Sequence, residues 1–481
     1  MYIVNDKYEC NIGLEIHCQI ISDSKLFSGS AAKFGGAPNS HVSFMDAGFP
    51  GQLPIINKVC VEQAIRTGLG LNATINETSV FARKHYFYAD LPSGYQISQH
   101  TQPLVTDGWV EITTEEGALK RVRIERLHVE QDAAKLFHDR SPDVSYVDFN
   151  RASVGLMEIV SKPDLTSPHE VGEYLKKLRS LVRWLGTCDG NMDEGSMRCD
   201  VNLSLRPIGS AVLGTRTETK NVNSVRFAMQ AVQFEARRQA EVLSGGGKVV
   251  QETRLFDAST GTTRAMRTKE NAIDYRYFPD PDILPLVLEQ GLVEKIRAGL
   301  PEMPDAKKAR FMAEFGLAEQ DAALLTSDIA LAKYFEEAAK GCNDGKLVAN
   351  WILGDLFALL NAEARDIEAS PVSAGALAEL VMLIKDGTIS GKIAKEVLAI
   401  VYKEGANPQK IVEERGMRQV SDTGAIEATV DTVIAASPEN VAAYRGGKVA
   451  LFGWFVGQVL KAMQGQANPA LVNDILKKKL G

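Results

Sequence analysis

Acidic side chains and histidines share one face of two predicted strands. Glu15 and His17 alternate with apolar residues in the segment GLEIHCQI, and His128, Glu130 and Asp132 do so in RLHVEQDAAK. Because successive side chains of a strand point to opposite faces, both segments predict a carboxylate and an imidazole on one side. A half-buried strand with a solvated face is the simpler interpretation of either segment alone.

A third acidic residue interrupts an apolar run. Glu158 is the one charged residue in GLMEIVS. An isolated buried carboxylate is costly, so we expect it to be paired, protonated or bound to a metal. A structural ion pair, for example with Arg151, is the alternative to a functional role.

Glu15, His17, Glu130 and Glu158 together form a carboxylate-rich set with one imidazole. Hard oxygen ligands favour Mg²⁺ or Mn²⁺ over zinc, which prefers cysteine and histidine. Magnesium sites with few protein ligands usually serve substrate phosphates. The set therefore indicates phosphoryl chemistry.

Two further segments supply candidate donors to a nucleotide. Lys84, Tyr86 and Ser93 lie in RKHYFYADLPSGYQISQ, and Arg198 and Asp200 share a strand face in DEGSMRCDVNLSLRP. An aromatic hairpin and a structural polar network are the respective alternatives. The chain has no G-x-x-x-x-G-K-[ST] loop, and GLGLNA ends a predicted helix instead of following a strand. Any nucleotide would therefore be bound by other means.

Length and composition indicate a soluble protein of several domains. The chain has 481 residues, 45% of them hydrophobic and 24% charged, which predicts two to four domains. Its net charge of −7 excludes a wholly basic nucleic-acid binder. Six cysteines without a C-x-x-C pair favour neither disulfides nor zinc. The N-terminus resembles no targeting peptide, and the apolar run 449–460 is too short to span a bilayer, so we expect a cytoplasmic protein without a membrane partner.

The pattern of residues changes once along the chain. Up to about residue 290 the sequence is strand-rich, with a hairpin predicted over 109–132 and helices over 168–186 and 224–247. Beyond that point helical patterns dominate, with a break before Pro408. We expect an α+β protein with a strand-rich cradle domain, an all-helical domain and a small helical tail domain. Their predicted bounds are 1–292, 293–407 and 408–481.

The C-terminal tail is basic, unlike the chain as a whole. Between residues 440 and 481 one acid, Asp474, accompanies six basic residues: Arg445, Lys448, Lys461, Lys477, Lys478 and Lys479. A solvated terminal helix would explain this charge. Contact with RNA phosphates is the sharper interpretation, and it predicts salt-dependent binding.

Several long segments, in order, resemble the GatB family, the B subunits of glutamyl/aspartyl-tRNA amidotransferases. The resemblance runs nearly end to end. It is carried by GLEIH (13–17), KHYFYADLPSGYQISQ (84–99), RLHVEQDAAK (126–135), ETKNVNSVRF (218–227), TRLFDASTG (253–261), DYRYFPDPDILPL (274–286) and GQANPALVNDIL (465–476).

The resemblance implies a three-subunit enzyme. The cradle would use ATP and Mg²⁺, or Mn²⁺, to phosphorylate the side-chain carboxylate of glutamate or aspartate on misacylated tRNA(Gln) or tRNA(Asn). Ammonia made from glutamine by the amidase subunit GatA would then displace the phosphate, with GatC as the third subunit. The tail would be YqeY-like and bind tRNA.

The same resemblance assigns roles to individual residues. Glu15, His17, Glu130 and Glu158 would form the metal site, Lys84, Glu130 and Gln131 would be catalytic, and Lys84, Tyr86, Ser93, Arg198 and Asp200 would bind the cofactor. Gln131 stands where many members carry a second carboxylate, and a glutamine side chain cannot take a proton from ammonium as that carboxylate could. Many members also hold zinc at positions that match Ser28, Ser30, Ser43 and Asp46, so we predict no structural zinc.

Two other functions fit the same features less well. A non-catalytic scaffold would bind tRNA and only position GatA, and it predicts no ATP cleavage. A stand-alone metal-dependent hydrolase acting on nucleic acid would release phosphate without a charged tRNA.

Overall fold

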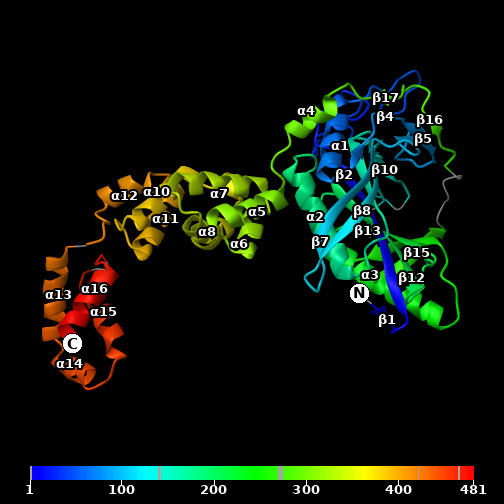
Figure 1. Ribbon diagram of the computed structural model, residues 1–481. Helices are drawn as coiled ribbons and strands as arrows, with labels where there is room; N and C mark the ends of the chain where they lie inside the picture. The colour runs from blue at the N-terminus through cyan, green and yellow to red at the C-terminus, as the bar shows by residue number, and fades with distance from the viewer. Residues whose placement is uncertain (1–2, 139–140, 142, 269–274, 421, 464–465) are drawn as a thin grey trace. The chain divides into compact units, whose positions relative to one another are not determined.

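The structure is a computed structural model of the chain (Figure 1). It describes every residue outside 1–2, 139–140, 142, 269–274, 421 and 464–465. Residues 274 and 465, which begin two of the segments that carry the resemblance, lie outside the described residues. The chain forms two compact units, Met1–Met303 and Pro304–Gly481.

A ten-stranded sheet forms the centre of the first unit. Its strand order is β15-β14-β13-β12-β2-β11-β8-β7-β3, with β1 beside β2. β13 and β14 run parallel, and the other neighbours run antiparallel. The bounds are β1 Ile3–Val4, β2 Tyr8–Gln19, β3 Thr74–Ile75, β7 Val105–Thr113, β8 Leu119–Gln131, β11 Gly155–Ser161, β12 Met197–Pro207, β13 Thr217–Val222, β14 Glu252–Asp257 and β15 Thr262–Thr268.

Among the described residues, smaller sheets and four helices complete this unit. β5 pairs with both β6 and β16, β4 pairs with β17, and β9 pairs with β10. Helices α1, α2 and α3 contact β8, β7 and β12 respectively. The bounds are β4 Thr78–Ser79, β5 Ala82–His85, β6 Tyr95–Ser98, β9 Lys135–Phe137, β10 Tyr146–Asp148, β16 Phe278–Pro279, β17 Leu286–Val287, α1 Lys58–Gly70, α2 Pro168–Trp184, α3 Val225–Ser244 and α4 Leu292–Ala298.

The side chains of β2 alternate between an apolar face and a polar face of the sheet. Ile12, Leu14, Ile16 and Cys18 are fully buried in the core that the helices cover. Strand alternation then puts the intervening polar residues on the opposite face. This confirms the predicted alternation of GLEIHCQI, and the predicted hairpin is also confirmed because β7 and β8 pair around a turn at Gly117.

Helices α2 and α3 confirm the two predictions from hydrophobic spacing. Each starts at a serine N-cap, Ser167 or Ser224, whose hydroxyl accepts a hydrogen bond from the backbone three residues on. Such a cap satisfies an amide that the helix itself leaves unpaired. The segment GLGLNA begins at the end of α1, as predicted, so its glycines do not follow a strand.

The second unit is helical. The tail helices α13–α16 surround a core of their own that includes Phe455, Val459 and Leu476. The bounds are α5 Pro304–Phe315, α6 Glu319–Leu325, α7 Ile329–Cys342, α8 Gly345–Trp351, the π-helix Ile352–Leu356, α9 Phe357–Ala362, the 3-10 helix Ile367–Ala369, α10 Ala374–Lys385, α11 Gly391–Glu404, α12 Pro408–Glu414, α13 Thr423–Ala435, α14 Pro438–Arg445, α15 Leu451–Ala462 and α16 Pro469–Leu480.

A sheet-rich unit followed by a helical unit confirms the predicted α+β class. The predicted boundaries at 292 and 407 stay predictions. In the structure α4 contacts α1 and belongs to the first unit. Among the helices described, none combines the length and apolar character needed to cross a membrane.

Candidate metal-binding active site

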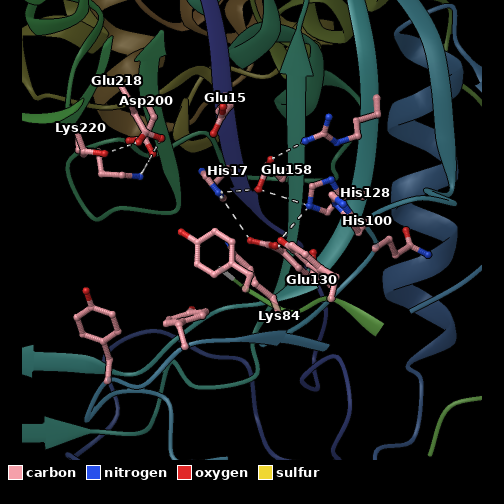
Figure 2. A pocket seen from close by; sticks show the side chains of 18 of the residues that line it. Glu15, His17, Lys84, His100, His128, Glu130, Glu158, Asp200, Glu218 and Lys220 are labelled. Carbon is pink, nitrogen blue, oxygen red and sulfur yellow. Dashed lines mark hydrogen bonds and ion pairs between the residues drawn. The ribbon is translucent and has the colours of Figure 1, made fainter. Parts of the chain in front are cut away.

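Neighbouring strands align the candidate residues across the polar face of the sheet (Figure 2). Glu158 on β11 lies opposite His17 on β2 and His128 on β8. Two residues before His17 on β2, Glu15 lies opposite Asp200 on β12. Antiparallel register therefore brings together residues that are far apart in the sequence.

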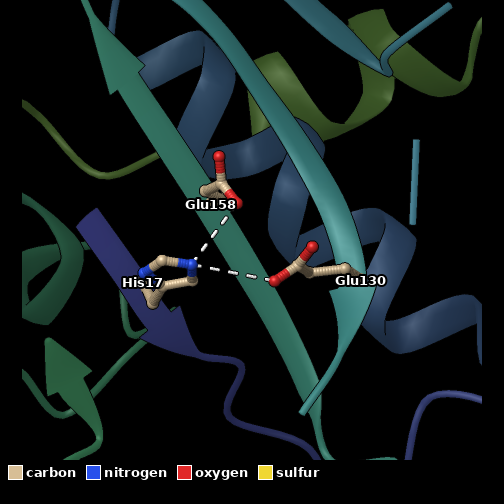
Figure 3. A group of neighbouring side chains, drawn as sticks. All are labelled: His17, Glu130 and Glu158. Carbon is tan, nitrogen blue, oxygen red and sulfur yellow. Dashed lines mark ion pairs between the residues drawn. The ribbon is translucent and has the colours of Figure 1, made fainter. Parts of the chain in front are cut away.

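His17, Glu130 and Glu158 form the first cluster (Figure 3). His17 Nε2 lies 3.3 Å from a Glu158 oxygen and 3.8 Å from a Glu130 oxygen. One ligand atom from each residue lies within 4.8 Å of the other two. The Ser98 hydroxyl also donates a hydrogen bond of 3.0 Å to Glu130. Two carboxylates and one imidazole at this spacing fit a divalent cation with several positions left for substrate or water.

His128 lies between the two carboxylates of this cluster. Its Nε2 is 3.4 Å from Glu130 and 3.5 Å from Glu158. Its Nδ1 is buried and has no hydrogen-bond partner among the described residues. Burial alone would lower the pKa of His128, but the attraction of Glu158 and Glu130 outweighs it and raises the pKa to about 9. We infer that His128 balances carboxylate charge that a bound cation would otherwise balance.

The same balance of charge acts on the cluster's own members. Burial lowers the pKa of His17, yet its hydrogen bond with Glu158 and the charges nearby raise it overall. Burial raises the pKa of Glu158, but the two histidines hold it well below its usual range. Charged carboxylates are the form that binds a metal, so these residues fit a divalent cation.

The ion pairs of Glu158 differ from the structural alternative suggested by the sequence. Glu158 lies 3.8 Å from Arg126, whereas Arg151 lies 3.6 Å from Asp132. The expectation of an Arg151 partner is therefore wrong. Arg151 follows the turn after β10 and donates to the carbonyl of Ala133 instead.

Glu15, Asp200 and Glu218 form a second acidic cluster, with ligand atoms again within 4.8 Å of one another. Lys220 Nζ lies 2.5 Å from Asp200 and 3.5 Å from Glu218. The Asn202 amide donates a hydrogen bond of 2.9 Å to Glu15. Burial lowers the pKa of Lys220, but Asp200 and Glu218 raise it above its ordinary value. This cluster is a second place where carboxylates face the same pocket.

A pocket of about 360 Å³ lies over both clusters. Its basic and aromatic wall includes Lys84, whose Nζ lies 5.0 Å from the centre of the Tyr275 ring. His100 stacks on Tyr277 with ring centres 4.1 Å apart. The other lining residues are Glu15, His17, Tyr86, Tyr88, Ser98, Gln99, Arg126, His128, Glu130, Glu158, Asp200, Arg216, Glu218, Lys220 and Thr253.

Three residues expected at the site do not belong to the described lining of this pocket. Ser93 donates to the carbonyl of Tyr95, and the Gln131 amide does so too. Arg198 donates to Asp132 over 2.6 Å. Their assigned roles stay predictions, and the contacts shown are structural.

Sequence reasoning missed several of the lining residues. Glu218 and Lys220 belong to the segment ETKNVNSVRF, but only the pairing of β13 with β12 brings them beside Asp200. Tyr277 lies outside the named strands and helices, so periodicity gave no signal for it. Arg126 is the first residue of the segment RLHVEQDAAK, two positions before His128, so alternation could have placed it on the polar face near Glu158.

The tail cations occupy two kinds of environment. Lys448, Lys461, Lys477 and Lys478 are exposed. Arg445 donates to the Leu480 carbonyl, and Lys479 pairs with Asp431 at 2.6 Å. The last two therefore also stabilise the tail. Binding of tRNA by this set stays a prediction.

The positions where zinc ligands were considered form a different structure. A fully buried ion pair joins Lys25 to Asp46 over 3.2 Å. Asp46 also accepts hydrogen bonds from the Ser28 hydroxyl and the Ser43 amide. Ser30 donates its amide to the Ser28 hydroxyl. The prediction of no structural zinc remains a prediction, and the donor set here is one that hydrogen bonds and an ion pair satisfy.

Fold and site together define a protein whose sheet presents two carboxylate clusters to a basic and aromatic pocket. Residues 10–294 match the family described as "GatB/GatE catalytic domain", and residues 333–480 match "GatB domain". The chain belongs to the GatB/GatE family.

Similar proteins from other organisms cover nearly the whole chain. The B subunit of the aspartyl/glutamyl-tRNA(Asn/Gln) amidotransferase from Paramagnetospirillum magneticum is 60% identical over 473 residues, which are 98% of this chain and 97% of the relative. The protein of the same name from Rhodospirillum rubrum is 59% identical over 473 residues, with the same coverage. That from Acidiphilium cryptum is 58% identical over 474 residues, 98% of this chain and 97% of its own.

Proposed function

We propose that this chain is the B subunit of an aspartyl/glutamyl-tRNA(Asn/Gln) amidotransferase and that its pocket activates a carboxylate with ATP. The names of its relatives support the first part. The single observation that supports the second is the pair of acidic clusters around one pocket that Lys84, Arg126 and Lys220 also line. Phosphoryl transfer requires carboxylates that hold cations and positively charged side chains that neutralise phosphate.

The chemistry begins with the side-chain carboxylate of glutamate or aspartate on tRNA. A carboxylate is a poor acyl donor because an oxide is a poor leaving group. One carboxylate oxygen therefore attacks the γ-phosphorus of ATP, ADP leaves, and an acyl phosphate forms. Ammonia then attacks the acyl carbon, phosphate leaves with the C–O bond electrons, and one proton is released to give the amide.

The chain's own residues would position and balance charge in this reaction. Glu130, Glu158 and His17 would hold one divalent cation, and Glu15, Asp200 and Glu218 would offer a second position. Bound Mg²⁺, or Mn²⁺, would supply charge neutralisation for the transferred phosphoryl group. Lys84 also lines the pocket, where its ammonium would meet an anionic substrate.

Aromatic residues would exclude water from the reacting group. Tyr86, Tyr275 and Tyr277 line the pocket, and burial raises the pKa of both Tyr86 and Tyr277 above the ordinary range. Neutral phenols at this wall donate hydrogen bonds without adding negative charge. An acyl phosphate is sensitive to hydrolysis, so a shielded pocket favours capture by ammonia over capture by water.

Ammonia would come from glutamine through the amidase partner GatA, with GatC completing the complex in the cytoplasm. All six cysteines of this chain are buried and lie outside the described lining of the pocket, so they are poorly placed as a glutaminase nucleophile. Gln131 would support the pocket through its hydrogen bond to the Tyr95 carbonyl and would not accept a proton. The tail would bind tRNA through its exposed lysines.

Oxygen tracing tests this function directly. Glu-tRNA labelled with ¹⁸O in the glutamate side chain would be converted by the assembled complex with ATP, Mg²⁺ and glutamine. The proposal predicts one ¹⁸O atom in the phosphate released, because the attacking oxygen leaves with the phosphoryl group. Unlabelled phosphate would show that the carboxylate is not phosphorylated. No phosphate release despite bound tRNA would favour the scaffold.

A further inference from the structure

Formation of the amide releases a proton, and a side chain of the pocket would have to accept it. Ammonia has three N–H bonds and the amide has two, so one proton leaves the nitrogen as the C–N bond forms. Until this proton leaves, the nitrogen is positively charged and is itself a good leaving group. A base beside the reacting carbon therefore favours the amide over the return of ammonia.

Most titratable side chains in the described lining of the pocket are poor proton acceptors. The lysines and arginines are cations already, and the five carboxylates of the two clusters would be bound to metal ions. The raised pKa values of His17 and His128 keep both imidazoles paired with carboxylates. Burial raises the pKa of Tyr86 and Tyr277, so these phenols stay neutral. His100 is the remaining histidine of this lining.

The segment before His100 is anchored beside the first cluster (Figure 2). Ser98, two residues earlier, donates its hydroxyl to Glu130. Gln99 is buried, and its side-chain oxygen accepts a hydrogen bond of 3.2 Å from the backbone of Val129. Two residues of extended chain span about 7 Å. The backbone of His100 therefore lies within about this distance of the residue that contacts Glu130.

Stacking orients the His100 ring and leaves its nitrogens open to a substrate. The ring centres of His100 and Tyr277 are 4.1 Å apart, and the two planes differ by 9°. Among the described residues, neither ring nitrogen of His100 has a hydrogen-bond partner. His100 is also exposed, so a proton that it accepts can pass on to phosphate or water.

The groups around His100 favour its neutral form. Burial lowers its pKa, and the positive charges of Arg126, His128 and Lys84 lower it further. Tyr277, stacked against the ring, is neutral. A histidine with a pKa below its ordinary value is unprotonated at neutral pH and can act as a base. The same three cations would repel the imidazolium and favour release of the proton.

We propose that His100 accepts the proton that ammonia loses when it attacks the acyl phosphate. The inference rests on the proposed function, because the acyl phosphate is the intermediate of that reaction. The nitrogen bonds to the acyl carbon, His100 takes one N–H proton, and phosphate leaves with the C–O bond electrons. The imidazolium then gives the proton to the departing phosphate, which balances the reaction and regenerates the base.

Rates of the two half-reactions test this role. The assembled complex, with Glu-tRNA, ATP and Mg²⁺, receives an ammonium salt in place of glutamine and is followed through one turnover. ADP measures phosphorylation, and Gln-tRNA measures amidation. We expect His100→Gln to form ADP at the wild-type rate and Gln-tRNA roughly a hundredfold more slowly. Phosphate should then exceed Gln-tRNA, because water captures the acyl phosphate that waits.

The pH profile separates a base from a structural role. The measured quantity is the amidation rate relative to the rate of ADP formation, at a constant concentration of free ammonia. In wild type it should fall as the pH drops below about 6.5, because the imidazole of His100 becomes protonated there. In His100→Gln it should show no such fall.

Two further variants separate chemistry from folding. His100→Phe keeps a ring that can stack on Tyr277 but removes both nitrogens, so it should lose amidation as His100→Gln does. His85→Gln is the matched control, since His85 stacks on Phe278 with ring centres 4.9 Å apart but lies outside the described lining of the pocket. It should keep both rates. Thermal melting of each variant shows whether the fold is retained.

Other outcomes would overturn the inference alone or together with the function. Equal amidation rates in wild type and His100→Gln, or the same pH profile in both, would overturn the inference and indicate that phosphate takes the proton directly. A loss of ADP formation in His100→Gln would also overturn it, because His100 would then act before ammonia attacks. Wild type that forms no ADP with Glu-tRNA would overturn the proposed function and the inference with it.

Discussion

His17 Nε2 lies 3.3 Å from the Glu158 carboxylate, on neighbouring antiparallel strands. Glu130 approaches the same nitrogen from β8 at 3.8 Å. Three strands thus bring one imidazole and two carboxylates to a single point. The surrounding charges favour the ionised carboxylates, so the cluster is ready for a cation once the histidine proton is released.

Removing the imidazole should weaken cation binding. We expect His17→Ala to reduce the affinity for Mn²⁺, used as a spectroscopic probe, by at least tenfold, because one of three ligands is lost. Electron paramagnetic resonance of free Mn²⁺ measures this directly. His138→Ala is the matched control, since His138 is exposed and contacts Ser145. Equal Mn²⁺ affinity in wild type and His17→Ala would remove His17 from the metal site.

Lys84 should matter for turnover more than for tRNA binding. Lys84→Met keeps the length of the side chain and its contacts with the aromatic wall but removes the charge. We expect at least a tenfold fall in phosphate release, because a charge facing the phosphoryl group is lost, with tRNA affinity unchanged. Lys58→Met, on the exposed side of α1, is the control. A fall in tRNA affinity alone would give Lys84 a binding role instead.

The buried pair of Lys25 and Asp46 should be required for stability. Lys25→Met leaves the Asp46 carboxylate buried without its cation, which costs on the order of 3 kcal/mol of unfolding free energy. Replacing both residues, as Lys25→Met with Asp46→Leu, should recover much of this loss. Urea unfolding measures the difference. A single variant as stable as wild type would show that the pair contributes nothing.

Glu235 should make stability depend on acid pH. Burial raises the pKa of Glu235, but Arg238, at 2.5 Å, and other donors lower it overall. Because the folded pKa lies below the unfolded one, this stabilisation is present above the unfolded value, about 4.3, and is lost as the pH falls through the folded pKa.

Glu235→Gln tests this sign. At pH 7 the variant should be less stable than wild type by on the order of 3 kcal/mol, since Arg238 loses a buried partner. The difference should shrink as the pH falls below about 4.3. Urea unfolding across this range measures it. A difference that stays constant with pH would contradict the assigned charge state.

The exposed lysines of α16 should contribute to the salt dependence of tRNA binding. Lys477→Ala and Lys478→Ala should each reduce the slope of log affinity against log salt by about 1, as a lost phosphate contact does. Lys410→Ala, exposed on α12, is the control. An unchanged slope of log affinity against log salt in both tail variants would contradict phosphate contact and favour a solvated terminal helix.

Local patterns predicted much of this fold. The alternation around Glu15 gave β2 and its polar face, and the turn at Gly117 gave the hairpin of β7 and β8. Both depend on neighbouring residues only. The change of residue pattern near residue 290 gave the sheet-rich part before the helical part, and the alternation of acidic residues and histidines gave the candidate metal ligands. The resemblance to a family added the roles of these residues.

Contacts that depend on strand register could not be predicted from the sequence. Glu218 reaches Glu15 only through β12, which lies between their strands, and Arg126 rather than Arg151 pairs with Glu158. Such pairings depend on which distant strands become neighbours.

Phosphate release by the assembled complex, with Glu-tRNA, ATP and Mg²⁺, is the most direct test of the central claim. It compares wild type with Glu158→Gln, which keeps the size of the side chain and removes the charge. The account predicts release that depends on charged tRNA in wild type, a loss of at least a hundredfold in the variant, and equal tRNA binding by both. Undiminished release by Glu158→Gln would place the reaction away from this cluster and contradict the account.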